Sequence, residues 1–249
     1  MAGRFNRIAW RGFDTVFAPW MRHHLRISMI GSAPAPLGSG PVILVSNHVS
    51  WWDGFLLHEI QKRIRPHSPL YTIALERELS AHPVLRLIGG VGMTPSSPSS
   101  ILRAMRGLQE RIAEDPDSMI GFFPQGCIAP SFRRPLGFTR GIELFARKIG
   151  NLTIIPVALH IEPLTGMAPT AFVHIGEPRL APNGEVDAES LQSDVTGLLD
   201  ATLAGLSLHG EDSVRAMSDA EASSAYAHRA THRATHRTVE AQLHGNHHA

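Results

Sequence analysis

A histidine and an aspartate five residues apart, His48 and Asp53, form the pair in this sequence best placed for acid–base chemistry. A carboxylate can accept a hydrogen bond from one imidazole nitrogen, which leaves the other nitrogen free to take a proton from a hydroxyl group. The same spacing also arises from a surface histidine followed by an aspartate that caps a helix. The sequence around the pair is therefore needed to distinguish these two interpretations.

The neighbouring residues predict a strand that ends just before the pair and a helix that begins just after it. The apolar run Val42–Ser46 follows Gly40 and Pro41, as a buried strand would. Asp53 is in position to cap a helix that runs to about Ile64. This arrangement puts His48 in a loop at the carboxyl end of a strand, where open α/β sheets usually place their ligands.

Short apolar runs alternate with helical patterns along the rest of the middle of the chain. Further strands are predicted at residues 70–74, 118–123, 154–160 and 171–175, and helices at residues 77–87, 98–111, 140–148 and 186–206. Gly89 and Gly90 are expected to close the first of these helices, and Pro98 to open the second. The alternation predicts an α/β fold with a central, mostly parallel sheet flanked by helices.

The residues around His48 resemble the N-H-x-S-x-x-D signature of the glycerolipid acyltransferases, the lysophosphatidic acid acyltransferase superfamily. The signature is matched at Asn47, His48, Ser50 and Asp53. Residues 122–127 resemble the F-P-E-G-T-R-S block of that family, and residues 155–158 resemble its later V-P-V block. The matched order and spacing cover about residues 42–160.

The resemblance implies direct acyl transfer from an acyl-CoA or acyl-carrier-protein thioester, with no cofactor and no metal. His48 would deprotonate the acceptor hydroxyl while Asp53 orients the ring, and backbone N–H groups would stabilise the oxyanion. Cys127 is a possible nucleophile, but a small side chain at the family's Thr position is the interpretation we favour. The resemblance assigns substrate binding to Asn47, Ser50, Thr94, Phe123, Pro124, Gln125 and Gly126.

The sequence departs from the family where cations would hold a phosphate. Residues 90–96 contain no Arg, Gln125 replaces the Glu of the second block, and Ile128 replaces its Arg. Arg133 and Arg134 follow closely but in a different register. Because a phosphate dianion favours charged, bidentate partners, we expect an acceptor without a phosphate at its reacting end, such as a lipid or glycoside hydroxyl or an amino lipid. A lysophosphatidic acid acyltransferase, a thioesterase and a non-catalytic lipid-binding protein remain alternatives.

Composition and charge limit the classes of partner. The chain has 249 residues, of which 43% are hydrophobic, enough for one domain with appendages. It has 23 Lys and Arg against 22 Asp and Glu, which argues against a dedicated nucleic-acid-binding protein. The single cysteine excludes an internal disulfide and a multi-cysteine zinc site. Residues 1–30 nevertheless carry a net charge of +4, whereas the middle of the chain is acidic.

Residues 1–30 have the pattern of an amphipathic helix. Its apolar face would carry Phe5, Ala9, Phe13, Val16, Phe17 and Trp20, and its polar face Arg4, Arg7, Arg11 and Asp14. Such a helix can cover the protein core or lie in a lipid headgroup region. With the family resemblance, we expect residues 1–30 to dock on an anionic membrane surface, residues 31–210 to form the acyltransferase domain, and the protein to bind the cytoplasmic side of the cell membrane peripherally.

The last part of the chain is rich in histidine and arginine. His228, His232 and His236 recur every four residues, a helical spacing that can bind a transition metal. The segment contains no carboxylate or cysteine set that would complete a defined site. We therefore expect residues 211–249 to be a disordered tail without a metal site.

Overall fold

The strand that leads to His48 lies in the centre of the sheet. The computed structural model describes residues 7–31 and 37–212, and within them β2 (Val42–Ser46) is buried at every residue. It pairs in parallel with β5 (Met119–Phe122) on one side and with β6 (Leu152–Glu162) on the other. A strand with neighbours on both edges and helices on both faces must be apolar throughout, which explains the run that predicted it.

The described strands form one sheet in the order β1-β7-β6-β2-β5-β3-β4, with β8 paired to β6. The remaining strands are β1 (Arg26–Ile30), β3 (Leu70–Leu75), β4 (Gly90–Met93), β7 (Thr170–Ile175) and β8 (Arg179–Ala181). Only β7 and β8 run antiparallel to β6, and the other described pairings are parallel. The predicted α/β class with a mostly parallel sheet is therefore confirmed.

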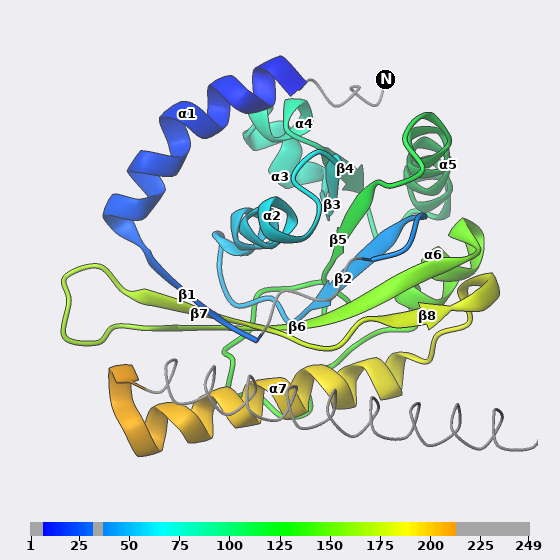
Figure 1. The fold of residues 1–249 in the computed structure, drawn as a ribbon. Coiled ribbons are helices and arrows are strands. Elements are labelled where there is room, and N and C mark those ends of the chain that lie inside the picture. Colours follow the sequence, from blue (N-terminus) through cyan, green and yellow to red (C-terminus); the bar gives the residue numbers. More distant parts are fainter. Residues whose placement is uncertain (1–6, 32–36, 213–249) are drawn as a thin grey trace, which may run out of the picture.

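Helices cover both faces of this sheet (Figure 1). The helices are α1 (Arg7–His24), α2 (Asp53–Ile64), α3 (Glu76–Ala81), α4 (Val84–Leu87), α5 (Pro98–Glu114), α6 (Gly141–Ile149) and α7 (Ala188–His209), with short 3₁₀ turns at Pro182–Gly184 and Gly210–Asp212. Because side chains alternate along β2, Val42 and Leu44 pack with α1 and α2, while Ile43 and Val45 pack with α5 and α6. Figure 1 shows α7 on the side of the sheet opposite α1 and α2.

The structure differs from the sequence-based expectations in several elements. Strands β1, β4 and β8 were not predicted, and β1 joins residues 26–30 to the sheet through its parallel pairing with β7. The helix predicted at residues 77–87 is wrong as a single helix. It is two helices, α3 and α4, separated at His82 and Pro83. Proline lacks the N–H that would continue the first helix and instead takes the N-cap position of the second.

Two aromatic side chains of helix α1, Phe13 and Phe17, pack against helix α2. Phe17 lies 4.3 Å from Phe55 of α2 between ring centroids, and Phe13 lies 5.9 Å from the same ring. On the outer side of the helix, Val16 is 76% exposed and Trp20 is 47% exposed. The expectation that Phe13 and Phe17 share a lipid-facing surface with Val16 and Trp20 is therefore wrong, because those two phenylalanines cover α2.

Two predictions concern residues that the structure covers only in part. Within the described ranges, no helix is both long and apolar enough to cross a membrane. The His- and Arg-rich tail, including His228, His232 and His236, lies outside the described residues, as do Arg4 and Phe5.

Candidate active site

Asn47 fixes the backbone where β2 ends. Its side-chain amide donates a hydrogen bond to the Leu159 carbonyl, and its side-chain oxygen accepts one from the Leu159 N–H, each at 2.8 Å. The β2–β6 ladder ends at Ser46, so the Asn47 amide group continues the pairing by one more step. Asn47 is only 1% exposed. It therefore positions the next residue, His48, and both ends of its side-chain amide are engaged by Leu159.

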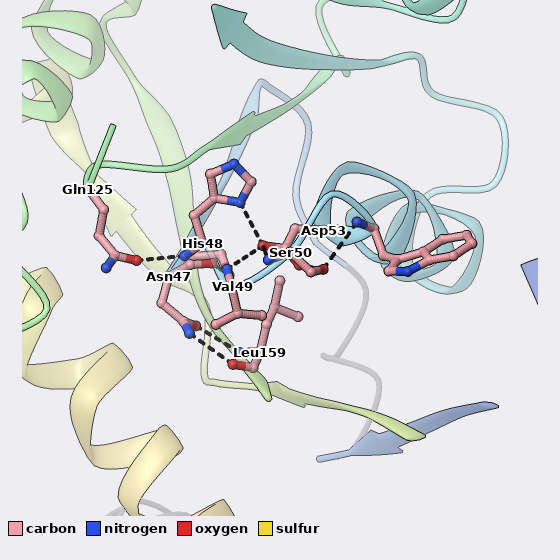
Figure 2. A network of polar contacts seen from close by, with 9 residues as sticks. Asn47, His48, Val49, Ser50, Asp53, Gln125 and Leu159 are labelled. Atoms are coloured by element: carbon pink, nitrogen blue, oxygen red, sulfur yellow. Dashed lines mark hydrogen bonds and ion pairs between the residues drawn. The ribbon is translucent and has the colours of Figure 1, made fainter. Parts of the chain in front are cut away.

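Asp53 holds the His48 ring from the first turn of α2 (Figure 2). Its Oδ2 lies 2.6 Å from His48 Nδ1 and also accepts the backbone N–H groups of Val49 and Ser50. Its Oδ1 accepts the Ser50 hydroxyl at 2.5 Å. The carboxylate is fully buried. This arrangement favours the tautomer with a proton on Nδ1, so that Nε2 is the nitrogen available to a substrate.

The two roles expected for Asp53 and Ser50 change accordingly. The Asp53 side chain does not cap α2, because all its bonds go to the loop before the helix and the N-cap residue is Trp52. The Ser50 hydroxyl donates to Asp53 and accepts the Trp52 N–H at 3.1 Å. Ser50 thus stabilises the orientation of the carboxylate, and its expected role in substrate binding stays a prediction.

A second loop, residues 123–139, holds His48 from the opposite side. The Gln125 side-chain oxygen accepts the His48 N–H at 2.6 Å, and the Gln125 amide donates to the Leu136 carbonyl at 2.9 Å. The His48 carbonyl accepts the Ala129 N–H at 2.9 Å. The ring of Phe123 stacks on the imidazole with centroids 4.4 Å apart. The His48 backbone and ring are therefore fixed on several sides, which is the preorganisation that a general base needs.

His48 opens into a cavity of about 360 Å³ between the sheet and helices α1 to α4. The walls are mostly apolar. They comprise Trp10, His48, Trp51, Gly54, Phe55, His58, Leu70, Thr72, Ile73, Ala74, Leu75, Arg77, Glu78, Leu79, Leu85, Ile88, Gly90, Met93, Pro95, Phe122, Phe123, Gly126, Cys127 and Ile128. An apolar cavity with a few polar groups and a base at one end is a typical small-molecule site.

The predicted substrate-binding residues divide into two groups. Phe123 and Gly126 line the cavity that His48 also lines. Thr94 and Pro124 do not line it. The Thr94 N–H donates to the Ser100 hydroxyl, and the Pro124 carbonyl accepts bonds from Thr139. Both ends of the Gln125 side chain also form hydrogen bonds to protein groups. Thr94, Pro124 and Gln125 therefore stabilise the loops around the cavity.

The turn after Phe123 is followed by two backbone N–H groups that bond to no described residue. The Gly126 N–H closes the turn on the Phe123 carbonyl, with Gly126 at φ +68°, where glycine is favoured. The N–H groups of Cys127 and Ile128 have no partner within the described residues, and both residues line the cavity with His48. Free N–H groups in a row can stabilise an oxyanion.

A comparison with protein families covers the residues that form this site. A model of the family described as Acyltransferase matches residues 25–160, more than half of the chain. The chain belongs to this acyltransferase family. The matched range runs from just before β1 to the end of the Asn47–Leu159 contact, so it contains every residue of the network around His48 in the acyltransferase. A comparison with individually curated proteins finds no match.

Of the arginine and lysine residues in the described ranges, only Arg77 lines the cavity. Arg134 bonds to the Ser131 carbonyl and to Asp200, and is thus engaged elsewhere. Arg77, which sequence reasoning missed, lines the cavity from the first turn of α3. It donates to Glu78 at 3.1 Å, and Glu78 also lines the cavity. The pairing lowers the net positive charge available to an anionic ligand.

The Gln125 side chain both accepts and donates a hydrogen bond. We therefore expect the glutamate that the family has at this position to be unfavourable here. Gln125→Glu should destabilise the acyltransferase by about 1–3 kcal/mol, because a carboxylate can accept the His48 N–H but cannot donate to the Leu136 carbonyl. Gln192→Glu is the matched control, since the Gln192 side-chain oxygen only accepts the N–H groups of Gly137 and Phe138. Equal free energies of unfolding for the two variants would contradict the role given to Gln125.

A second histidine of the cavity wall makes the acyltransferase sensitive to acid. Burial, together with the smaller effect of the nearby charge of Lys62, lowers the pKa of His58 from 6.5 to about 3. The other charged group that faces this ring is Asp14 of α1, with Oδ1 3.9 Å from Nε2. Because the unfolded state binds the proton more tightly, the stability contributed by neutral His58 is complete above pH 6.5. It is lost as the pH falls from 6.5 towards 3, on the order of 1 kcal/mol per pH unit.

This pH dependence should disappear in His58→Phe. Urea unfolding of the wild type and of this variant at pH 7, 6 and 5 should give a stability difference that grows in favour of the variant as the pH falls. The same substitution at the exposed His67 should leave the wild-type profile unchanged. Parallel profiles for wild type and His58→Phe would rule out the acid effect of His58.

Proposed function

We propose that the protein transfers a fatty acyl group from an acyl-CoA or acyl-carrier-protein thioester to a hydroxyl group of a lipid acceptor that has no phosphate at its reacting end. The observation that carries this proposal is the His48–Asp53 pair, which leaves His48 Nε2 at the mouth of an apolar cavity. The lining among the described residues has one arginine, and that arginine is bonded to Glu78. A neutral acceptor group suits such a site better than a phosphate dianion.

The chemical step needs no covalent enzyme intermediate. His48 Nε2 takes the proton of the acceptor hydroxyl while Asp53 stabilises the resulting imidazolium. The oxygen attacks the thioester carbonyl, and the N–H groups of Cys127 and Ile128 stabilise the tetrahedral oxyanion. Collapse of this intermediate breaks the carbon–sulfur bond, and His48 returns the proton to the departing thiolate. The products are an ester and a free thiol.

The apolar cavity is the place for the acyl chain in this proposal. Its volume of about 360 Å³ is within the usual range of small-molecule sites. The acyl chain would lie in this cavity, with the thioester beside His48 and the Phe123 ring.

An acceptor panel tests the proposal. Purified protein would receive dodecanoyl-CoA or dodecanoyl-acyl-carrier protein with lysophosphatidic acid, monoacylglycerol or an alkyl glycoside, and products would be identified by mass spectrometry. We expect ester formation on the neutral hydroxyl acceptors. Equal transfer to lysophosphatidic acid would instead identify a lysophosphatidic acid acyltransferase. Release of free fatty acid without any ester would identify a thioesterase, and no turnover at all would identify a lipid-binding homologue.

We also propose that the protein binds the cytoplasmic side of the cell membrane peripherally, through the outer side of α1. Val16 and Trp20 are exposed there, and Trp51 is 46% exposed beside the cavity. The rings of Trp20 and Trp52 lie 5.4 Å apart, and those of Trp51 and Trp52 lie 5.6 Å apart. Exposed tryptophans beside a basic helix are typical of interfacial binding. The lipid acceptor would then enter the cavity from the bilayer.

Membrane binding can be tested without removing α1, whose Met21 is part of the core. Val16→Ser combined with Trp20→Ser should weaken co-sedimentation with phosphatidylglycerol vesicles at least ~10-fold, because two apolar side chains no longer enter the interface. Leu208→Ser is the matched control, since Leu208 is 77% exposed on α7, across the sheet from α1. Unchanged sedimentation of the double variant would count against docking through α1.

A further inference from the structure

A hydrogen bond between Ser131 and His160 attaches the loop at residues 123–139 to the sheet. Ser131 Oγ lies 2.7 Å from His160 Nδ1, and the two residues are only 8% and 7% exposed. On the other side of the ring, His160 Nε2 donates to Glu162 Oε2 at 3.2 Å. Burial lowers the pKa of His160, although Glu162 raises it, so the ring is neutral at pH 7 and its Nδ1 accepts the Ser131 hydroxyl.

His160 lies on β6 directly after Leu159, the residue that bonds to Asn47 at the end of β2. Because side chains alternate along a strand, Leu159 packs on the side of α1 and α2, and His160 points to the side of α7. On that side, Arg134 donates to the Ser131 carbonyl and also pairs with an aspartate of α7. Two consecutive residues of β6 therefore hold the two loops of the candidate site.

Polar contacts, rather than apolar packing, fix the part of the loop next to the cavity. The two large apolar side chains of this part point into solvent, with Ile128 55% exposed and Phe132 76% exposed. Of the residues between them, Ala129 and Ser131 are buried, and Ala129 contributes only a methyl group. A buried hydroxyl group stabilises the fold only when it is bonded. The bond from Ser131 to His160 is therefore a main attachment of this segment.

The backbone of Cys127 and Ile128 depends on this attachment. The next residue, Ala129, donates its N–H to the His48 carbonyl, and Ser131 follows two residues later. Donors to an oxyanion must lie within ~2.7–3.1 Å of it, and a misplacement of about 1 Å can greatly slow a reaction. Release of Ser131 would therefore affect the two N–H groups that the proposed reaction uses.

We propose that Ser131 and His160 are positioning residues for the acyl-transfer step, which hold the N–H groups of Cys127 and Ile128 in place for the oxyanion. This inference rests on the proposed function and adds two residues to its machinery. Neither side chain is among the described residues that line the cavity. Because the negative charge exists only in the tetrahedral intermediate, the effect falls on the chemical step and not on binding of the thioester.

The test separates kcat from KM in variants of this contact. Ser131→Ala and His160→Phe should each lower kcat about 10-fold and leave the KM for dodecanoyl-CoA unchanged, since a misplaced donor acts only in the transition state. The double variant should lose no more than either single variant, because all three remove the same bond. Ser131→Thr keeps the hydroxyl group and should keep most of the wild-type kcat. The pH dependence of kcat should be unchanged, because the contact of His48 with Asp53 is intact.

Thr202→Val is the matched control. Thr202 Oγ1 of α7 lies 3.0 Å from His174 Nδ1 of β7, a buried contact of the same kind on the same side of the sheet, away from the loop. This variant should keep the wild-type kcat. Hydrogen–deuterium exchange of residues 126–132 gives a readout without turnover. Exchange should be about 5-fold faster in Ser131→Ala than in the wild type or Thr202→Val, as the loss of one hydrogen bond allows.

The outcomes separate this inference from the proposed function. An active wild type with unchanged kcat in Ser131→Ala and His160→Phe would overturn the inference, as would an equal loss of kcat in Thr202→Val or an effect on KM alone. A wild type that forms free fatty acid and no ester would contradict only the proposed acceptor. Hydrolysis passes through the same kind of oxyanion, so kcat would then be measured by thiol release. A wild type that turns over no thioester would contradict both. If His160→Phe does not fold, Ser131→Ala and Ser131→Thr decide.

Discussion

Replacing His48 by alanine should reduce acyl transfer by about 10²–10⁴-fold, the usual contribution of a general base, and leave the protein folded. His48 is partly exposed, and Asp53 keeps three other hydrogen bonds after its removal. We therefore expect the free energy of unfolding to fall by only about 1 kcal/mol. Initial rates with dodecanoyl-CoA and a neutral acceptor, together with urea unfolding, measure both quantities.

The control for this variant is His67→Ala, which removes an exposed imidazole outside the cavity. Its rate and stability should equal those of the wild type. If His48→Ala keeps more than about a tenth of the wild-type rate, a general-base role for His48 is excluded.

Asp53→Asn should remove activity and stability together. The carboxylate is fully buried and accepts four hydrogen bonds, two of them from backbone N–H groups. An asparagine presents one NH₂ group to these donors and leaves at least one of them unpaired. The expected loss is about 2–4 kcal/mol of unfolding free energy. Transfer should fall by about 10²–10⁴-fold because the His48 tautomer is no longer fixed.

Asp187→Asn is the matched control for this substitution. Asp187 accepts a single bond, from the Ser190 N–H at the start of α7, and asparagine serves as well as aspartate at an N-cap. Its unfolding free energy should change by less than about 0.5 kcal/mol. A stable but inactive Asp53→Asn would show that the carboxylate acts only on the ring, and a stable, active one would contradict both roles.

Much of the fold could be predicted because buried parallel strands are continuous apolar runs. This holds for β2, whose predicted bounds are those observed, and for β6. The missed strands lack that signal. β4 contains two glycines in four residues, β1 is mostly half-buried and polar at its start, and β8 has only three residues. The break between α3 and α4 could have been predicted from Pro83.

The candidate site could be predicted only where its residues are close in sequence. The His48–Asp53 contact follows from the five-residue spacing. The contact of Asn47 with Leu159 spans 112 residues, and no local pattern identifies such a partner. The apolar periodicity of α1 likewise does not say whether Phe13 and Phe17 meet lipid or another helix, since both environments select the same side chains.

The long reach of the Asn47–Leu159 contact also affects when the enzyme can begin to work. β2 is synthesised first, but both of its sheet neighbours, β5 and β6, come later in the chain. At ~5–20 residues per second, Leu159 is translated roughly 6–22 s after Asn47. During this interval the nascent chain on the ribosome contains the His48 loop without the strand that fixes it. The catalytic loop is therefore assembled late in synthesis, and chains that stop before β6 are released without a completed site.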